Sequence, residues 1–325
     1  SPSSSLTGTA PYPTCRTQKA AFPGYGAHPS LKFYLMSQTI SLRLIRRLVA
    51  GKKRLTPEAL RLMRGFTASQ CLADSSFMNR RGESDLYYTA FGWLLAYLLE
   101  LPLNAQQQAT YLTQQQPNSF DLVHYAAYRR CQLLHRLCTV GALRLAWEQR
   151  KAQTPPTFEQ FAAMPLDDPW SPYTRFLWLS LQEDCGQRLS SAQLELAQLA
   201  HYQTPEGGYA NVAGWPTAST NATTAALSVI GQLIGYHPHT ALTYLCDSQQ
   251  QTGGFSATAV SPVPDLLSTA TALFTLKNYT VTPRYPAADF VEAHWLANGG
   301  FAPTLLEEES DVEYLFYGLL ALGSL

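Results

Sequence analysis

Residues 251–269 read QTGGFSATAVSPVPDLLST, and the same order of features occurs twice more, in EGGYANVAGWPTASTNATT (206–224) and NGGFAPTLLEEESDVEYLF (298–316). Each copy places a Gly-Gly-aromatic turn before a polar residue that opens a further stretch rich in apolar residues. The second glycines are Gly208, Gly254 and Gly300, so they recur every 46 residues. A constant interval of this length predicts a tandem repeat of one supersecondary unit.

Each unit is predicted to be a helical hairpin. A helix rich in Gln and Leu comes first, as in SSAQLELAQLAHYQ (190–203) and HTALTYLCDSQQQ (239–251). Glycine ends this helix because it adopts left-handed backbone angles without a Cβ penalty. Ser219, Asp265 and Asp311 then stand at expected N-cap positions, before a second helix that is apolar nearly all round. The pattern indicates an amphipathic outer helix paired with a buried inner helix.

Looser copies of the unit extend toward the N-terminus. Three earlier hairpins are expected within 56–99, 104–137 and 157–182. Six hairpins with their apolar helices inside favour a closed ring, because a ring gives every inner helix two inner neighbours. We therefore predict an all-α fold, an α/α toroid (barrel) of about six helical hairpins.

The domain organisation follows from this repeat. Residues 31–325 are expected to form a single α/α-toroid domain, with an extra N-terminal helix at 31–49 before the first hairpin. Residues 1–30 are rich in Ser, Pro, Gly and Thr and contain no acidic residue, so we expect a flexible tail there.

Composition narrows the classes of function. The 325 residues are 46% hydrophobic and 14% charged, and the formal net charge is zero, which argues against a nucleic-acid partner. The cysteines show no metal-binding spacing, and most of them are expected to be reduced, so we favour a cytoplasmic location. The segment 31–54 carries basic residues and no acidic one. It could contact an anionic membrane surface or a protein partner, or simply expose a basic face while its other side packs on the domain.

The turns QTGGF and EGGY and the helix opening PDLLSTATAL resemble the repeats of protein prenyltransferase β subunits and squalene-hopene-type terpene cyclases. SDLYYTAFGWLLAYL is also similar to short bacterial prenyltransferase-like toroids. The resemblance implies an apolar funnel between the inner helices that holds an isoprenoid chain, with aromatic side chains facing it. Aromatic faces suit both apolar chains and developing carbocations. The aromatic residues expected there are Tyr87, Tyr88, Phe91, Trp93, Tyr125, Tyr128, Tyr173, Phe176, Trp178, Phe274, Tyr314, Phe316 and Tyr317.

The catalytic signatures of these families are incomplete. The zinc site of prenyltransferase β subunits would need a Cys two residues after Asp265, where Leu267 stands, and the next repeat offers no His. The acidic D-x-D-D run of the cyclases corresponds to Asp265-Leu266-Leu267-Ser268, which keeps one carboxylate. We therefore expect neither a metal nor another cofactor.

Acidic N-caps recur at one end of the inner helices. Asp85, Asp121, Asp265 and Asp311 would form a ring of carboxylates around the funnel mouth, although capping alone, worth about 1 kcal/mol each, suffices to explain them. By the resemblance, Asp265 is the favoured acid and Asp311 the second candidate, with Asp85 as a contact for the substrate. His124 lies near the same end and could exchange protons or serve only in a structural hydrogen bond.

Three functions remain open from sequence. The first is an isoprenoid- or polyene-handling enzyme of the terpene cyclase and prenyltransferase-like group, with a carboxylate as acid or head-group anchor. The second is a non-catalytic toroid that binds a lipid or protein partner. The third is a carbohydrate-active α toroid, which would need two carboxyl groups about 5–10 Å apart.

Overall fold

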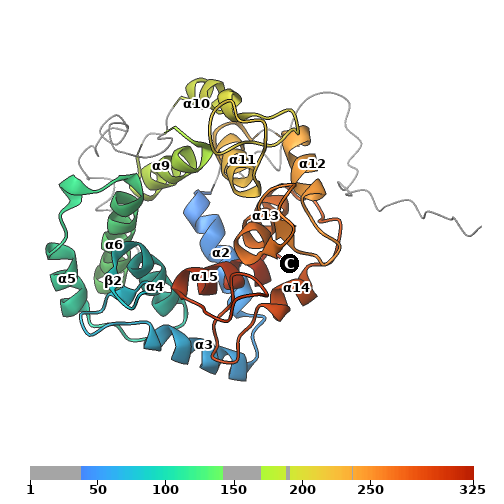
Figure 1. Ribbon diagram of the computed structural model, residues 1–325. Helices are drawn as coiled ribbons and strands as arrows, with labels where there is room; N and C mark the ends of the chain where they lie inside the picture. Colours follow the sequence, from blue (N-terminus) through green and yellow to red (C-terminus); the bar gives the residue numbers. More distant parts are fainter. Residues whose placement is uncertain (1–37, 142–169, 188–190, 236) are drawn as a thin grey trace, which may run out of the picture.

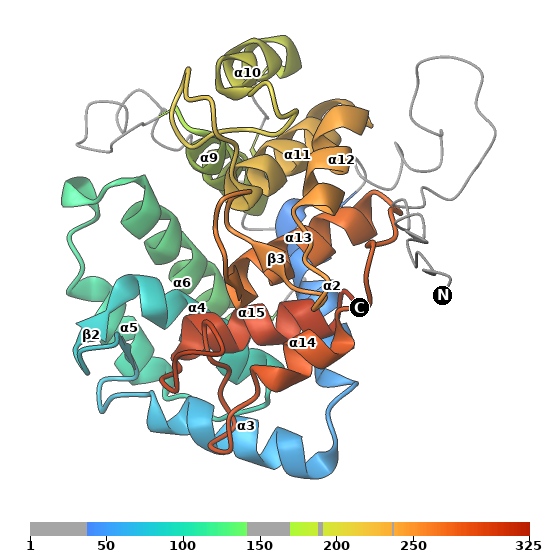
Figure 2. The same ribbon diagram turned by 45° about the vertical axis from the view of Figure 1, so that its right-hand side comes forward.

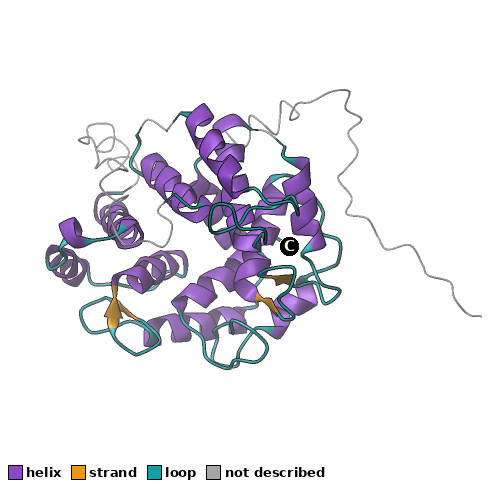
Figure 3. Cartoon of the chain, turned by 45° about the horizontal axis from the view of Figure 1, so that its top comes forward, coloured by secondary structure: helices purple, strands orange, loops and turns teal. Residues whose placement is uncertain are grey.

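A computed structural model describes residues 38–141, 170–187, 191–235 and 237–325. The tail predicted at 1–30 and the outer helix predicted at 157–164 lie outside these residues. The described chain is almost entirely helical, and its strands are two residues long (Figure 3). The all-α prediction is confirmed.

Six inner helices form a closed ring (Figure 1). Each inner helix contacts the next along the chain, and the last contacts the first. The inner helices are α4 (Leu86–Leu98), α6 (Leu122–Val140), α9 (Pro172–Asp184), α11 (Thr220–Ile234), α13 (Leu266–Asn278) and α15 (Val312–Leu322). The toroid predicted from the repeat is therefore present.

Shorter elements surround this ring. The outer helices are α3 (Pro57–Ser69), α5 (Ala105–Thr113), α10 (Ala192–Leu199), α12 (His239–Asp247) and α14 (Ala288–Ala293). Two 3₁₀ turns, η1 (Pro117–Ser119) and η2 (Ala200–Tyr202), join outer to inner helices. In two repeats the turn pairs with the residues before the inner helix as a small antiparallel sheet, β1 (Phe77–Met78) with β2 (Ser84–Asp85) and β3 (Phe255–Ser256) with β4 (Pro264–Asp265).

Every inner helix begins at a side-chain N-cap. The cap oxygen accepts a hydrogen bond from an amide of the first turn, which satisfies a donor that the helix itself leaves unpaired. The capping residues are Asp85, Asp121, Ser171, Ser219, Asp265 and Asp311. All six lie at one end of the ring, which we call the mouth.

The repeated glycines have two different roles. Gly253 and Gly299 adopt left-handed φ angles of +93° and +94°, which a side chain disfavours. Gly254 permits close packing, since a Cβ there would lie 2.4 Å from the ring of Phe290 on the next outer helix. A Cβ on Gly299 would lie 2.4 Å from the backbone of Leu62 on α3. The turn of the last hairpin thus packs on the first outer helix, which closes the ring.

A threonine in the first turn of the inner helix holds the turn aromatic in place. The hydroxyl of Thr269 donates to the carbonyl of Asp265 (2.7 Å) and accepts from the amide of Phe255 (2.9 Å). Thr89 and Thr223 occupy the same position in their repeats and make the same pair of bonds. In these three repeats the threonine ties the turn to its own inner helix, whereas in the last repeat the amide of Phe301 donates to the hydroxyl of Ser310 (3.0 Å) instead.

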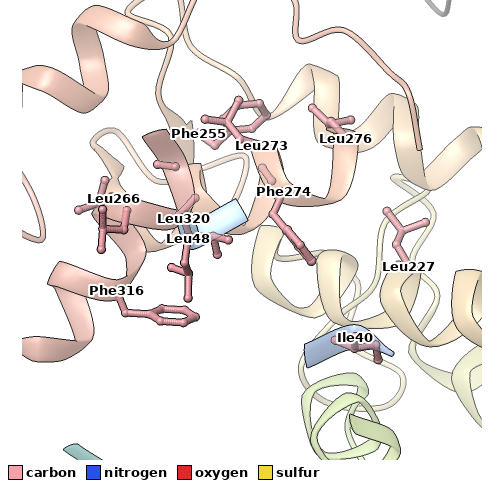
Figure 4. Packing of buried hydrophobic residues seen from close by; sticks show 14 of the residues in the cluster. Ile40, Leu48, Leu227, Phe255, Leu266, Leu273, Phe274, Leu276, Phe316 and Leu320 are labelled. Atoms are coloured by element: carbon pink, nitrogen blue, oxygen red, sulfur yellow. The ribbon is translucent and has the colours of Figure 1, made fainter. Parts of the chain in front are cut away.

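Apolar side chains fill the space between the two helical layers. Figure 4 shows part of this core, in which Phe255, Leu266 and Leu273 are fully or almost fully buried. Leu48 of the N-terminal helix belongs to the same cluster. The outer layer is therefore held to the inner ring by continuous apolar contact.

Helix α2 (Ile40–Lys52) lies across the interior of the ring (Figures 1 and 2). It begins at Ile40 because Thr39 caps it, and it extends three residues beyond the helix predicted at 31–49, of which residues 31–37 lie outside the described chain. The amide of Ile40 donates to Glu183 (2.8 Å), and Lys52 donates to the carbonyl of Leu98 (2.7 Å), at the ends of α9 and α4. Helix α2 thus closes the end of the ring opposite the mouth, which we call the floor.

Backbone contact seats α2 against α15. A Cβ added to Gly51 would lie 2.2 Å from the carbonyl oxygen of Leu319, and a Cβ on Gly323 would lie 1.8 Å from that of Arg47. No side chain fits at either position without a shift of the backbone. These two glycines therefore allow the helix to lie directly on the end of α15.

Two further sequence expectations concern compartment. In the part of the chain that the structure describes, no helix is long and apolar enough to cross a bilayer. Cys71, Cys131, Cys138 and Cys185 carry free thiols, whereas Cys246 is disulfide-bonded, so the expectation of reduced cysteines holds for the first four.

Candidate functional site

The ring encloses a cavity of about 530 Å³ between the mouth and the floor. All six inner helices and α2 contribute to its wall. This volume lies within the range of roughly 300–1,000 Å³ that is typical of small-molecule sites. Its aromatic lining consists of Tyr87, Phe91, Tyr173, Phe176, Phe274, Phe316 and Tyr317.

The aromatic side chains form a continuous wall where the first and last inner helices meet. The ring of Phe91 lies edge-on to Tyr87 at 5.0 Å and to Phe316 at 5.1 Å, measured between centroids. Phe316 in turn lies edge-on to Tyr317 at 5.4 Å. Such pairs are favourable by about 0.5–1.5 kcal/mol beyond the area they bury, so the wall is a preformed surface.

Helical register explains which residues face the cavity. On α4 the lining residues are Tyr87, Ala90, Phe91 and Leu94, and on α15 they are Glu313, Phe316, Tyr317 and Leu320. Both sets stand two, five, six and nine residues after the N-cap, which places them on one face of the helix. Side chains at other distances from the cap point between helices or toward the outer layer.

Glu313 is the carboxyl group nearest the mouth in the cavity wall. It stands in the first turn of α15 and accepts a hydrogen bond from the hydroxyl of Tyr87 (2.8 Å). Burial raises the pKa of Glu313, and the hydrogen bond from Tyr87 partly opposes this rise. Tyr173 and Tyr317 stand near it, and the pKa of each is also raised by burial. The arrangement can hold a protonated carboxyl group against an apolar space.

A second polar group lies near the floor. The carboxylate of Asp184 accepts a hydrogen bond from the hydroxyl of Ser41 (2.8 Å) and lies 3.7 Å from Nε of Arg130. Arg130 also donates to the hydroxyl of Ser180 (2.9 Å). Burial raises the pKa of Asp184, whereas the Arg130 guanidinium acts in the opposite direction. Asp184 therefore has a positive partner, and Glu313 is held instead by a neutral tyrosine.

The structure places Asp265 outside the cavity lining. Both of its oxygens are engaged by Ser268, one by the amide and one by the hydroxyl, each at 2.7 Å. Burial raises the pKa of Asp265, and the bonds from Ser268 lower it. Its observed contacts are those of an N-cap.

Asp311 and His124 also lie away from the cavity. The side chain of Asp311 is 2% exposed, caps α15 and accepts a hydrogen bond from Nε of Arg80 (2.8 Å). Nδ1 of His124 lies 2.8 Å from Oδ1 of Asp121, on a side chain that is 45% exposed. Asp85 caps α4 and contributes no lining atom. The ring of acidic caps is present, but the cavity wall does not include it.

Six aromatic residues expected at the funnel lie in other places. Trp93 is 1% exposed and donates to the carbonyl of Ser75 (2.7 Å), toward the outer layer. The ring of Tyr314 stacks under Arg80 at 5.2 Å. The remaining four, packed between helices and also outside the lining, are Tyr88, Tyr125, Tyr128 and Trp178. The other expected aromatics, which the cavity does bring together, are Tyr87, Phe91, Tyr173, Phe176, Phe274, Phe316 and Tyr317.

Within the described ranges, no group of three or more His, Cys, Asp and Glu side chains could hold a metal ion.

The fold and the cavity together define an α/α toroid with an enclosed apolar site. The chain is similar in structure to Candida albicans protein geranylgeranyltransferase-I, solved in complex with GGPP, at 14% sequence identity and a TM-score of 0.45. The match covers 90% of this chain and 85% of that one. No family model matches the sequence, and no curated protein matches it either.

Proposed function

We propose that this protein binds an isoprenoid or polyene chain in its cavity and acts as an acid on it, as an enzyme of the terpene cyclase and prenyltransferase-like group. The observation that carries the proposal is a cavity of about 530 Å³ with aromatic walls and a half-buried carboxyl group, Glu313, toward the mouth. Burial disfavours the charged form, so Glu313 keeps its proton to a higher pH than an exposed glutamate does.

The chemistry needs no co-reactant. The carboxyl group of Glu313 gives its proton to one carbon of an alkene, and the neighbouring carbon becomes a carbocation. Phe91 and Phe316 stand in the same wall and stabilise positive charge through their ring faces. Loss of a proton from the final cation to the Glu313 carboxylate restores the acid, so the net reaction is an isomerisation or cyclisation.

Tyr87 is the positioning residue for this acid. Its hydroxyl donates to Glu313, which stabilises the carboxylate left after proton transfer. The two residues come from the first and last inner helices, so the acid stands at the seam where the ring closes. In the same place a neutral Glu313 could instead anchor a polar head group, and the experiment below separates acid from anchor.

The spacing of acids argues against carbohydrate processing. The two cavity carboxyl groups belong to the first turn of α15 and to the last residue of α9. An inner helix of 13 residues is about 20 Å long, and the two groups stand at opposite ends of such helices. Paired glycosidase carboxylates stand about 5–10 Å apart.

Chromatography coupled to mass spectrometry, which separates a product from a substrate of equal mass, tests the proposal on the protein incubated with prenyl diphosphates and with squalene. We expect a converted product from the wild type, loss of turnover with retained chain binding in Glu313→Gln, and little change in Asp265→Asn, the matched control outside the cavity. Equal turnover in wild type and Glu313→Gln would show that Glu313 is not the acid. Retention of a chain without turnover in any form would favour the non-catalytic lipid-binding toroid.

A further inference from the structure

A second cavity lies beside the first, toward the floor. Its volume is about 280 Å³, and it lies between the second half of α4, the segment leading into α5 and the end of α6. These three helices are adjacent in Figures 1 and 2. Its lining consists of Trp93, Ala96, Tyr97, Glu100, Leu101, Leu103, Ala105, Gln108, Leu134, Cys138 and Thr139. We call it the side compartment.

One side chain belongs to the walls of both cavities. Leu134 lines the main cavity and the side compartment. Its neighbours on α6 divide between the two spaces, because Leu133 and Leu137 line only the main cavity and Cys138 and Thr139 only the side compartment. Leu134 therefore stands at the boundary between the two spaces, and we call it the partition.

The side compartment lies beside the distal part of the main cavity. Glu313 stands at the start of α15, near the mouth, whereas Leu134 stands in the second half of α6, near the floor. A chain whose reacting end meets Glu313 extends its other end toward Leu134. On the far side of the partition, Ala96, Leu101 and Leu103 give an apolar surface, and Gln108 and Thr139 add polar groups.

We infer that the side compartment is a subsite for the distal end of the ligand chain and that Leu134 sets the chain length the protein accepts. This inference rests on the proposed function. In the wild type the Leu134 side chain ends the space available to the chain. Truncation of this side chain joins the two cavities and adds room for a further isoprene unit, which extends the chain by five carbons. Each ligand methylene that an apolar pocket newly accommodates or excludes changes the affinity for that ligand by about tenfold or more.

The test compares Leu134→Ala with Leu122→Ala, which removes the same atoms from the same helix but lines neither cavity. Farnesol and geranylgeraniol, which differ by one isoprene unit, are the probes, and their dissociation constants are measured by tryptophan fluorescence. We expect the affinity ratio of geranylgeraniol to farnesol to rise by about tenfold in Leu134→Ala and to stay unchanged in Leu122→Ala. An equal ratio in both variants overturns the inference.

Cys138 supplies a readout that does not depend on turnover. Its thiol is free and exposed and lines only the side compartment. We expect geranylgeraniol to slow labelling of Cys138 by N-ethylmaleimide in Leu134→Ala and not in the wild type, as followed by peptide mass mapping. Unchanged labelling in Leu134→Ala overturns the inference even if the affinity ratio moves.

Two further outcomes complete the design. Leu134→Val, a smaller change, is expected to shift the ratio in the same direction by less, and it replaces Leu134→Ala if that variant does not fold. If neither prenol binds to the wild type or to any variant, the proposed function fails and this inference fails with it. If farnesol binds to every form but the ratio does not move, the proposed function stands and only the subsite is refuted.

Discussion

Gly51→Ala tests whether α2 is seated on α15 as the floor of the cavity. The new Cβ would lie 2.2 Å from the carbonyl oxygen of Leu319 and 3.1 Å from its carbonyl carbon. Both atoms belong to the backbone, so no side-chain rotation relieves the overlap, and α2 must move away from α15. Overpacking of this kind costs about 1–3 kcal/mol. Alanine recovers about 1 kcal/mol through helix propensity, so we expect a net loss of up to about 2 kcal/mol.

The matched control is Gly65→Ala, on α3. A Cβ at Gly65 meets no atom within 4 Å, and the residue lies inside a helix, so the same substitution should stabilise the protein by about 0.5–1 kcal/mol. Urea unfolding followed by circular dichroism measures both free energies, and farnesol binding reports whether the floor still closes the cavity. If Gly51→Ala stabilises the protein as much as Gly65→Ala does, the close contact between α2 and α15 is refuted.

Other predictions concern single groups. Burial raises the pKa of Glu183 to about 7, so the folded state holds a proton that the unfolded state releases. The contribution of Glu183 to the free energy of unfolding is fully present below about pH 4.5 and is lost as the pH rises through about 7. The free energy of unfolding should therefore fall by at most about 3 kcal/mol between pH 5 and pH 8 through this group, and Glu183→Gln should remove that share of the fall. Thr269→Val leaves the buried amide of Phe255 without its acceptor and should cost about 1–3 kcal/mol, whereas Thr110→Val on the exposed face of α5 should change stability by less than about 0.5 kcal/mol in the same urea experiment. Equal losses in the two threonine variants would show that the tie between turn and helix contributes nothing.

The ring could be predicted from sequence because its determinants are local. A Gly-Gly turn and an N-cap act within a few residues, and their constant spacing indicates the repeat without any knowledge of long-range contacts. The threonine four residues after the cap, as in Thr89 and Thr269, was a further signal of the same kind. The role of this recurring threonine becomes clear only from the structure, which shows its hydrogen bond to the turn amide.

Aromatic residue type alone predicts the cavity wall poorly, because helical register determines which side chains face the cavity. Phe91 faces the cavity and Trp93 faces the outer layer, although both are large apolar rings on one helix. Counting from Asp85 would have separated them. The same count from Asp311 leads to Glu313.

The position of α2 could not be read from its own residues. Its basic and apolar pattern shows that one face packs, but many surfaces offer a partner to such a face. The contact depends on Gly51 meeting Gly323, residues that are far apart in sequence and not distinguished by any local rule. The charge pattern would place every basic residue of α2 on an exposed face, but Arg43 is 3% exposed.

Because the first and last hairpins meet at one seam, the cavity can be completed only after the last hairpin has been synthesised. Tyr87 and Glu313 meet across this seam, as do Arg80 and Asp311, over more than 200 residues of chain. A nascent chain on the ribosome therefore carries an open arc of hairpins, with its apolar inner face uncovered, until α15 has emerged. A chaperone that recognises apolar surface would bind this arc and be displaced as the circle completes. Premature termination before α15 would leave that surface exposed permanently. Such a chain would lack both one wall of the cavity and Glu313.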